Sequence, residues 1–369
     1  MTDDDRNYSL AAPSAGKQIP APNLPYRPRD PKTYQPEIGL IACGGITEDH
    51  LTAYRAAGYR VTALCDPVVE RAEKRRTEFY LDAKVFRDYR DLLELPDVEV
   101  VDLAAHPQQR AAMIEDALQA GKHVLSQKPF VLDLDLGQRM VELADRQGVR
   151  LAVNQNGRWA PHFSYLREAI AAGLLGGVMA VHASVHWDHS WVKGTDFEKI
   201  HHLILYDFAV HWFDIVTCFL GERPARQVYA STVRSPAQDI DPPLLAQAVI
   251  EYDDAQASLA FDAHTRLGTQ DRTYIVGSDG TAVSTGPDLK QQTVTLYTSE
   301  GHAKPELTGC WFPDGFHGTM GELLSAIEEG REPIHSARNN LRTLELCFAA
   351  VASAERHEPV IPGTVRTMP

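Results

Sequence analysis

The strongest constraint on the fold is a regular alternation of short apolar runs and helical stretches between residues 37 and 155. Apolar runs of strand length occupy residues 38–43, 59–65, 98–104, 123–126 and 149–154. Amphipathic stretches separate them, two of which cover residues 108–120 and 133–147. Strands that alternate with helices of this length pair in parallel. We therefore expect a Rossmann domain, a doubly wound parallel sheet, over residues 37–155.

The pattern changes after Pro161. One strand is expected at 178–187, followed by a strongly apolar helix at 203–220. Further strand-like runs cover residues 227–234, 245–252, 256–263, 273–276 and 294–297, and helices at 319–329 and 337–356 follow. Short links rich in Gly, Asp and Pro favour antiparallel pairing of consecutive strands. We expect residues 156–369 to form an α+β domain around a large, open, mostly antiparallel sheet.

Residues 1–36 differ from both segments, because they hold seven of the 23 prolines and show almost no apolar periodicity. Such a segment cannot build a core of its own. Two alternatives remain open. It is either a disordered tail or an extended arm that lies on a neighbouring subunit or across the mouth of the active site, anchored by Tyr26 and Tyr34.

Composition excludes several classes of protein. The net charge of −14 disfavours binding to nucleic acids and to anionic membranes. The five cysteines are scattered and odd in number, which indicates a reducing compartment. We find no stretch long and apolar enough to cross a membrane and no secretory signal, so we expect a soluble, cytoplasmic protein.

The turn after the first expected strand resembles a dinucleotide-binding turn. The pattern Gly-x-Gly-x-x-Gly is met here by Ala42, Gly44 and Thr47, so only the middle glycine is kept. A helix N-terminus follows and provides an anion site for pyrophosphate. The residues expected to surround it are Cys43, Gly44, Gly45 and Ile46.

Asp66 ends the second expected strand, 22 residues after Gly44. A carboxylate there accepts hydrogen bonds from the adenosine ribose and repels a 2′-phosphate, which favours NAD over NADP. The alternative is NADP, if a cation from the next helix turns back toward this site. The candidates are Arg71, Lys74, Arg75 and Arg76.

Two further segments carry groups suited to acid–base chemistry. Lys128 follows the strand 123–126, at the edge where open α/β sheets bind ligands, and Pro129 constrains its turn with a trans or a cis peptide bond. Asp207 and His211 lie one turn apart on the apolar helix, with Asp214 three residues further. A buried histidine beside a carboxylate is either a satisfied core residue or a tuned general base.

Taken in order, these motifs resemble the Gfo/Idh/MocA oxidoreductases. The chain contains Cys43-Gly44-Gly45 in the first turn, Cys65-Asp66-Pro67, Lys128-Pro129, the run Asn154 to Trp159, and the spacing Asp207-x-x-x-His211. The resemblance covers about residues 37–360. It implies a catalytic set of Lys128, Asp207 and His211, and a nicotinamide site that includes Ala105, His106, Gln127, Lys128 and Gln155.

The chain departs from the family pattern at several positions. Ala42 replaces the first glycine, and Gln127 stands where the family has the glutamate of Glu-Lys-Pro. A family Thr-Pro-Pro stretch is replaced by Ala105-His106-Pro107. Lys128, Asp207 and His211 are all retained.

The resemblance implies hydride transfer between NAD and a secondary alcohol of a sugar, glycoside or cyclitol. His211 would accept the hydroxyl proton, and Lys128 would donate a hydrogen bond to the reacting oxygen. Asp207 would hold the imidazole or bind a neighbouring hydroxyl group.

Six of the 15 histidines lie between residues 182 and 211, interleaved with three tryptophans. We interpret the cluster as a pocket wall, with a transition-metal site and ordinary packing as alternatives. The residues expected to contact substrate are Lys128, Arg158, Trp159, His186, Asp188, Lys193, Asp207, His211 and His317. We expect no bound metal.

Two competing functions remain open. One is glycoside cleavage by transient oxidation and elimination with no net redox change, and the other is a cofactor-dependent regulator without activity.

The expected open sheet would leave one apolar face uncovered. We therefore also expect a homo-oligomer, a dimer or tetramer.

Overall fold

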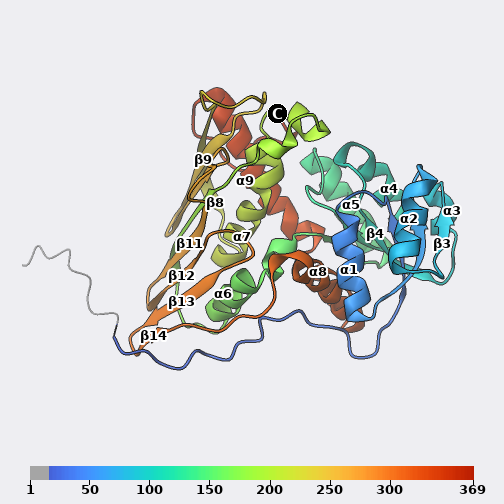
Figure 1. Cartoon of the computed structure of the whole chain (residues 1–369), viewed down its shortest axis with the longest axis horizontal. Coiled ribbons are helices and arrows are strands. Elements are labelled where there is room, and N and C mark those ends of the chain that lie inside the picture. The colour runs from blue at the N-terminus through green and yellow to red at the C-terminus, as the bar shows by residue number, and fades with distance from the viewer. Residues whose placement is uncertain (1–15) are drawn as a thin grey trace, which may run out of the picture.

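The computed structural model describes residues 16–369 and contains two sheets that face each other across a layer of helices (Figure 1). The smaller sheet has six strands and the larger has eight. This is the expected combination of a Rossmann sheet with a large, mostly antiparallel sheet.

The six-stranded sheet has the order β3-β2-β1-β4-β5-β6, and every neighbouring pair is parallel. Its strands are β1 (Glu37–Ile41), β2 (Arg60–Cys65), β3 (Lys84–Phe86), β4 (Val98–Leu103), β5 (His123–Ser126) and β6 (Leu151–Val153). The helices that link them are α1 (Thr47–Ala57), α2 (Val69–Phe79), α3 (Tyr89–Leu93), α4 (Pro107–Gln119) and α5 (Leu134–Gln147). The carboxyl ends of β1, β2, β4, β5 and β6 therefore bring the expected cofactor residues to one edge.

The eight-stranded sheet has the order β14-β13-β12-β11-β7-β10-β9-β8. Its strands are β7 (Val178–His186), β8 (Ala225–Val233), β9 (Leu245–Tyr252), β10 (Gln256–Asp262), β11 (Gln270–Gly277), β12 (Gly280–Gly286), β13 (Thr293–Thr298) and β14 (Gly301–Ala303). Consecutive strands from β8 to β10 and from β11 to β14 are antiparallel, as expected. The exception is β7, which lies between β11 and β10 and is parallel to β10.

Helices α6 (Pro161–Ala171), α7 (Val210–Leu220), α8 (Trp311–Glu328) and α9 (Ala337–Arg356) lie between the two sheets (Figure 1). Short helical turns occupy Asn156–Trp159, Ser190–Val192 and Asp196–Lys199. Although α8 belongs to the second half of the sequence, it packs on the first domain. Phe316, Met320, Leu323 and Leu324 of α8 join the core formed by β1, α1 and β2.

The apolar helix expected at 203–220 is divided into two parts. Residues Ile204–Phe208 form a π-helical turn, in which the Ala209 amide donates to the carbonyl oxygen of Ile204. The α-helix α7 begins only at Val210. Single π turns often occur at functional sites, and this one carries Asp207.

The described part of the N-terminal segment, residues 16–36, is an extended arm on its own chain (Figure 1). The His302 amide of β14 donates to Lys17, the Ser164 hydroxyl of α6 donates to Tyr26, and the backbone amides of residues 32–34 donate to Glu328 of α8. Over this range the segment is an extended arm that is hydrogen-bonded to its own chain. The predictions for residues 1–15 lie outside the described residues.

The outer face of the large sheet, opposite the helices, is open to solvent. Side chains on this face alternate with buried ones along each strand, and large apolar examples include Met179, Tyr229, Val249 and Tyr297. Among the described residues, no helix is long and apolar enough to cross a membrane.

Candidate active site

The turn after β1 has the geometry of a dinucleotide site. Ala42 occupies the first glycine position with φ +70°, a left-handed conformation that a glycine adopts at less cost. A Cβ atom added to Gly44 or Gly45 would meet no other heavy atom within 4 Å. Both positions are thus open toward the N-terminus of α1, where a pyrophosphate fits. The Ala42 methyl group leaves this opening free.

Asp66 lies directly behind the turn. Its Oδ2 accepts the Cys43 amide at 2.8 Å, and its Oδ1 accepts the Val68 amide at 2.8 Å. Each carboxylate oxygen retains a further lone pair for a ribose hydroxyl. The residue therefore has a structural role in the turn in addition to the expected contact with the cofactor.

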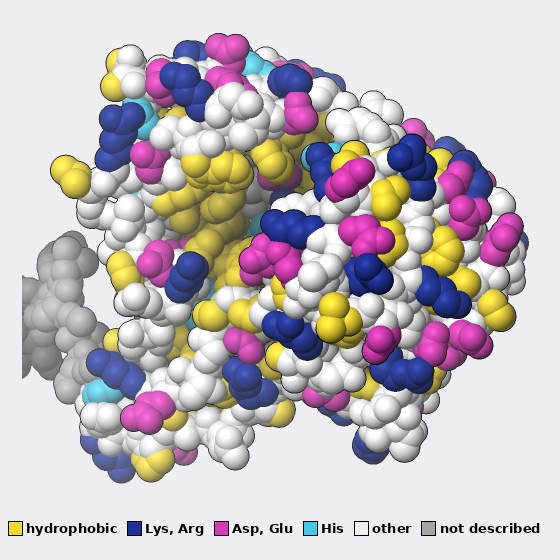
Figure 2. Space-filling model, turned by 45° about the vertical axis from the view of Figure 1, so that its right-hand side comes forward, with side chains coloured by type: hydrophobic (Ala, Val, Ile, Leu, Met, Phe, Trp, Pro, Cys, Tyr) yellow, Lys and Arg dark blue, Asp and Glu magenta, His cyan; other side chains and the backbone are white. Residues whose placement is uncertain are grey.

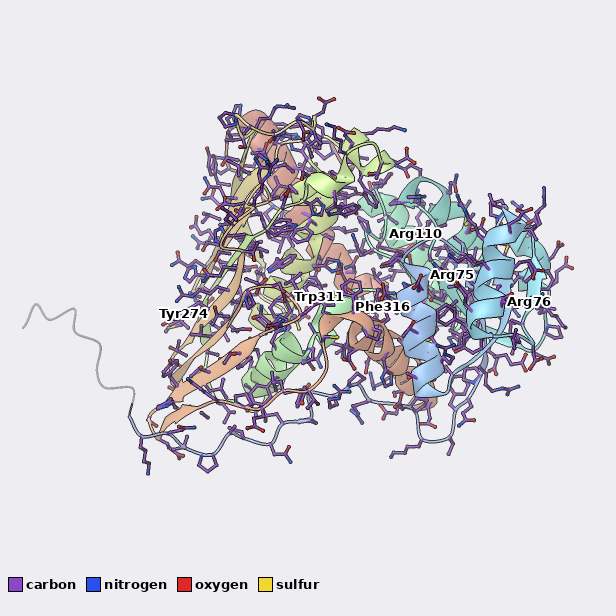
Figure 3. All side chains as sticks on the ribbon, viewed as in Figure 1. Arg75, Arg76, Arg110, Tyr274, Trp311 and Phe316 are labelled. Carbon is purple, nitrogen blue, oxygen red and sulfur yellow. The ribbon has the colours of Figure 1, made fainter. Side chains whose placement is uncertain are left out.

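Arg75 turns back from α2 toward the site, as the NADP alternative required (Figure 3). Its guanidinium, however, donates to the carbonyl oxygens of Gly44 and Gly45 at 3.2 and 3.3 Å and pairs with Glu48 and Glu78. Because its donors hold the turn and two carboxylates balance its charge, it is poorly placed to bind a 2′-phosphate.

The turn that carries Lys128 is held by a buried cation. Arg110 on α4 is 1% exposed and donates to the carbonyl oxygens of Ala105, Gln127 and Pro129. Burial lowers the pKa of Arg110 to about 10. The peptide bond between Lys128 and Pro129 is cis. Sequence analysis missed Arg110, because a contact to carbonyl oxygens 5 to 19 residues away leaves no local pattern.

Lys128 and Asp207 meet across the two domains. The lysine Nζ lies 3.0 Å from Oδ1 of Asp207 and 2.9 Å from its carbonyl oxygen. Both side chains are 19% exposed, so the pair is accessible from the cleft. The sequence led us to expect Asp207 to orient His211 or to bind a hydroxyl group. In the described structure its carboxylate binds Lys128.

His211 lies on α7 with its ring 5.4 Å from that of Trp311, nearly perpendicular to it. Its Nδ1 is buried and has no hydrogen-bond partner among the described residues. Burial, and then the charge of Lys128, lower the pKa of His211 well below its usual value. The imidazole is therefore neutral at pH 7 and able to accept a proton.

The expected nicotinamide-side residues lie at the ends of β4, β5 and β6. Ala105 and Gln127 are buried, whereas His106 is exposed at the beginning of α4. Gln155 is 1% exposed, and neither its amide nitrogen nor its amide oxygen has a partner in the described structure. A buried amide without partners is costly, and a bound ligand that meets it would remove that cost. These residues fit a bound dinucleotide.

An aromatic wall runs from the other side of the cleft, where Trp187 and Phe208 are partly buried, into the core, where Trp212 and Trp311 are buried. Trp187 stacks on Phe208 at 4.1 Å, Phe208 stacks on Trp212 at 4.8 Å, and Trp212 lies 5.7 Å from Trp311. Figure 2 shows hydrophobic side chains gathered in the hollow between the two lobes, and Figure 3 places Trp311 between the large sheet and the first domain. Trp311 was not selected from the sequence, because it lies 100 residues from His211 and before the helix expected at 319–329.

His189 belongs to the histidine cluster that we interpreted as a pocket wall, although it was not among the residues expected to contact substrate. Its Nδ1 accepts the indole N–H groups of Trp187 and Trp191 at 2.9 and 3.3 Å. Burial lowers the pKa of His189 to about 4, although the nearby charge of Asp207 opposes this effect. The ring is thus neutral and carries its proton on Nε2.

Two expected substrate residues lie in the core instead of the cleft. Arg158 is 3% exposed and forms a bidentate pair with Asp214, with further bonds to Ile334 and Asn339. Trp159 is buried against Gly318 of α8. Their place after the last Rossmann strand, which faces the cleft in the family arrangement, suggested a pocket role, but both side chains are buried in the packing between the domains.

Four other expected substrate residues have partners away from Lys128. His186 lies on the outer face of the large sheet and pairs with Asp262, because it alternates with the inward-facing Val185. Asp188 accepts the amide and hydroxyl of Ser190 within its own turn. The remaining two form exposed pairs, Lys193 with Asp239 and His317 with Asp30.

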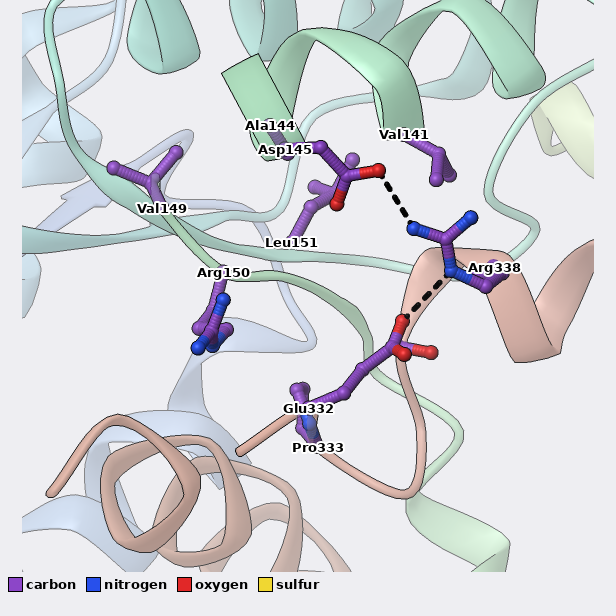
Figure 4. A pocket seen from close by; sticks show the side chains of 10 residues that line it. Val141, Ala144, Asp145, Val149, Arg150, Leu151, Glu332, Pro333 and Arg338 are labelled. Atoms are coloured by element: carbon purple, nitrogen blue, oxygen red, sulfur yellow. Dashed lines mark hydrogen bonds and ion pairs between the residues drawn. The ribbon is translucent and has the colours of Figure 1, made fainter. Parts of the chain in front are cut away.

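The described residues contain no group of three or more His, Cys, Asp or Glu side chains placed to hold a metal ion. A cavity of about 270 Å³ lies away from the cleft, between the end of α5, β6 and the segment before α9 (Figure 4). Its walls carry Arg150 and two ion pairs of Arg338, with Asp145 and with Glu332. None of the expected site residues lines this cavity.

Comparison with known proteins identifies the architecture. Residues 37–155 match the model of the oxidoreductase family with an NAD-binding Rossmann fold, and residues 163–283 match the GFO/IDH/MocA C-terminal domain. The chain belongs to the Gfo/Idh/MocA family of oxidoreductases. It is an NAD-dependent dehydrogenase that acts on CH–OH groups.

Three relatives illustrate the similarity. The D-apiose dehydrogenase of Paraburkholderia graminis is 26% identical, with 87% of this chain and 88% of the relative covered. The inositol 2-dehydrogenase of Rhizobium meliloti is 25% identical, with 87% and 98% covered. An oxidoreductase from Agrobacterium radiobacter, solved with NAD⁺, L-tartaric acid and magnesium, superimposes with a TM-score of 0.80 at 22% identity, covering 89% and 99% of the two chains.

Proposed function

We propose that the protein transfers a hydride reversibly between a secondary alcohol of a sugar or cyclitol and NAD, with Lys128, Asp207 and His211 as its catalytic residues. One observation carries the proposal. The Lys128 amine leaves the edge of the Rossmann sheet and meets Asp207 of the second domain at 3.0 Å, close enough to His211 to depress the pKa of its imidazole. The acid–base groups and the expected nicotinamide edge thus share one cleft.

The roles follow from the chemistry of each side chain. His211, kept neutral by burial, accepts the proton of the substrate hydroxyl as the carbinol C–H bond breaks. Lys128 donates a hydrogen bond to the same oxygen and stabilises its developing negative charge. Asp207 holds the ammonium group in place. NAD, when bound at the turn after β1 and the ends of β4 to β6, would supply the hydride acceptor.

The cofactor contacts are proposed residue by residue. Cys43, Gly44, Gly45 and Ile46 would surround the pyrophosphate, and Asp66 would bind the adenosine ribose. The nicotinamide side would be formed by Ala105, His106, Gln127, Lys128 and Gln155. Support comes from the open space at the turn and from the amide of Gln155, which lacks partners.

A variant of the turn tests this placement. Gly44→Ala adds a methyl group where the protein has free space, so the folded protein should keep its stability. If pyrophosphate occupies that space, the affinity for NAD, measured by quenching of tryptophan fluorescence, should fall at least tenfold. Unchanged affinity would place the pyrophosphate elsewhere.

The aromatic wall and the names of the relatives support a polyol substrate. Aromatic rings stack on the apolar face of a sugar, and the rings of Trp187 and Phe208 in this wall are only partly buried. The relatives act on D-apiose and on inositol by their names. We propose that the substrate of this protein is a compound of the same class, and that Lys128, Asp207 and His211 contact it.

A spectrophotometric screen tests the activity. Monosaccharides, inositols and simple glycosides are each mixed with NAD or NADP, and absorbance at 340 nm is followed. We expect a stoichiometric rise with at least one polyol and NAD, and loss of this rise in Lys128→Met. Release of sugar from a glycoside without net reduction would support the elimination mechanism instead. Activity retained within a few-fold in Lys128→Met would reject the catalytic assignment.

We further propose that the outer face of the large sheet packs on a second copy of the chain. The exposed apolar residues Tyr229, Val233 and Val249 support this, since such faces are usually covered. Light scattering after gel filtration should give the mass of a dimer or a tetramer, and Val249→Arg should lower the measured mass of the assembly.

We also propose that the protein is cytoplasmic. All five cysteines are free thiols, which supports this location.

A further inference from the structure

A buried chain of hydrogen bonds leads from the core of the Rossmann domain to the backbone of Lys128. Asp102 Oδ2 lies 2.7 Å from His50 Nδ1, and His50 Nε2 lies 3.2 Å from Gln127 Nε2. Gln127 Oε1 in turn accepts the backbone amide of Lys128 at 2.7 Å. Both His50 and Asp102 are fully buried. Of the residues that these hydrogen bonds link, only Lys128 belongs to the proposed catalytic set.

The direction of each bond in the chain is determined by its two ends. A backbone amide can only donate, so the atom of Gln127 that faces Lys128 must be its oxygen. The amide nitrogen of Gln127 then faces His50 and donates to Nε2. Asn154 places a second amide nitrogen 3.4 Å from the same Nε2. His50 therefore accepts at Nε2 and carries its proton on Nδ1, which donates to Asp102.

This arrangement gives a physical reason for glutamine at position 127. A glutamate would still accept the Lys128 amide, but its second oxygen would face the lone pair of His50 Nε2, with no proton between them unless His50 took up a second one. Two buried acceptors in contact are unfavourable. Glutamine supplies the missing donor, so Gln127 and the neutral His50 are complementary.

We propose that His50 is a positioning residue for Lys128 and acts through Gln127. Arg110 fixes the neighbouring carbonyl oxygens of this turn, whereas the chain from His50 fixes the Lys128 amide. With both sides of the backbone held, the side chain leaves the turn in the direction of Asp207. The inference rests on the proposed function, because it assigns no chemistry to His50 itself.

A pair of variants separates positioning from mere packing. In His50→Gln the side-chain oxygen lies near the former Nε2 and can still accept from Gln127, but the bond to Asp102 is lost. In His50→Asn the nitrogen lies near the former Nδ1 and can still donate to Asp102, but Gln127 loses its partner. We expect His50→Asn to lower kcat at least tenfold, because small displacements of reacting groups are costly. His50→Gln should lose no more than about threefold.

Tyr54→Phe is the matched control. The Tyr54 hydroxyl donates to the same Asp102 oxygen at 2.7 Å and takes no part in the bonds from His50 to Gln127 and Lys128. We expect this variant to lower the melting temperature while kcat stays unchanged. If stability alone mattered, Tyr54→Phe and His50→Asn would lower kcat in proportion to their loss of stability. His50→Asn, which keeps the bond to Asp102, would then lower kcat less than His50→Gln.

A second readout does not depend on turnover. Lys128 is labelled with acetic anhydride in competition with the exposed Lys199, and the modified peptides are quantified by mass spectrometry. A lysine held against Asp207 reacts slowly, so His50→Asn should raise the relative rate for Lys128 several-fold, whereas His50→Gln should not. Equal labelling rates of Lys128 in both variants and in the wild-type protein would overturn the inference.

If His50→Asn does not fold, Gln127→Met provides the same test with a side chain of similar size. It removes both bonds of the chain and should reproduce the lower kcat and the faster labelling. The failure of the inference differs from the failure of the proposed function. Full activity in Lys128→Met rejects the function, whereas an inactive Lys128→Met together with normal kcat and labelling in His50→Asn rejects only the inference.

Discussion

Lys128 of the Rossmann domain contacts Asp207 of the second domain twice, with the lysine Nζ 3.0 Å from Oδ1 and 2.9 Å from the carbonyl oxygen of the aspartate. The second contact depends on the π turn, since the Ala209 amide bonds five residues back and the Asp207 carbonyl accepts the lysine. A local irregularity of one helix thus creates part of the binding site for the amine.

The charge of Lys128 should be visible in the pH dependence of the reaction. Burial and this charge both lower the pKa of His211. In Lys128→Met only burial remains, so the pKa of His211 should rise toward its ordinary value. We expect the acid limb of kcat/KM for the residual activity to move to higher pH. The C2 proton of His211, followed by NMR, gives the same shift without turnover.

Lys74→Met is the control for charge alone, because Lys74 forms an exposed pair with Glu78 on α2. It should leave the acid limb of the profile in place. An acid limb that stays fixed or moves to lower pH in Lys128→Met would contradict the assignment of His211 as the base.

Arg110 should not be replaceable by lysine. Its planar fork donates to several carbonyl oxygens at once, and an ammonium group cannot match that geometry. We expect Arg110→Lys to lower kcat at least tenfold and to cost about 3 kcal/mol of unfolding free energy, since buried carbonyl oxygens lose their partners. Urea denaturation and steady-state kinetics measure the two effects.

Arg76→Lys on α2 is the matched surface replacement, with a side chain 40% exposed and paired to Glu73. It should change neither quantity measurably. Wild-type kinetics in Arg110→Lys would show that charge, and not the fork, holds the turn.

The protein should be more stable with glycine at position 42 than with the alanine that stands there. A residue with a side chain pays about 1–2 kcal/mol in the left-handed region, and part of the gain from glycine is offset by its greater freedom in the unfolded chain. Ala42→Gly should therefore raise the unfolding free energy by up to about 1 kcal/mol. Gly58→Ala at φ +77°, where a Cβ meets no neighbour, should show the opposite sign. Thermal unfolding of both variants decides whether the sign is right.

Buried histidines should make the fold sensitive to acid. Burial lowers the pKa of His162 to about 3 and those of His123 and His189 to about 4. Between these values and about 6.5 the unfolded chain binds more protons than the folded chain, so stability rises with pH in this window and is constant above it. At pH 5 each buried imidazole costs roughly 1–2 kcal/mol relative to pH 8.

His162→Gln isolates one of these contributions. The loss of unfolding free energy between pH 8 and pH 5 should shrink by about 1–2 kcal/mol in this variant. The exposed His201→Gln should leave the loss as it was. An unchanged pH dependence in His162→Gln would mean that the ring is protonated in the folded protein.

The sequence predicts the fold well where local periodicity and position agree. Strands ending at Cys65 and Ser126 place Asp66 and Lys128 at one sheet edge, as expected. Periodicity cannot reveal a nonlocal choice of partner, so the insertion of β7 beside β10 was not foreseen. The same limit applies to His186, since an even spacing shows that two side chains share a face but not which face it is.

Several predictions for single residues could not be made from type and spacing. Arg158 was expected in the cleft because it follows the last Rossmann strand, as in the family arrangement, yet it pairs with Asp214 in the core. Trp311 and Arg110 act through contacts that only the folded chain creates. Lys128, Asp207 and His211 were selected because their motifs are short and local, and these three remain the proposed catalytic set.

The N-terminal arm has a consequence for how the two halves can move. It is bonded to the edge strand β14 at one end and, through Glu328, to the helix that packs on α1 at the other. Any opening of the halves by rotation would have to stretch this tether or detach it. Proteolytic removal of the residues before Glu37 would consequently change the freedom of the cleft while both sheets keep all their strands.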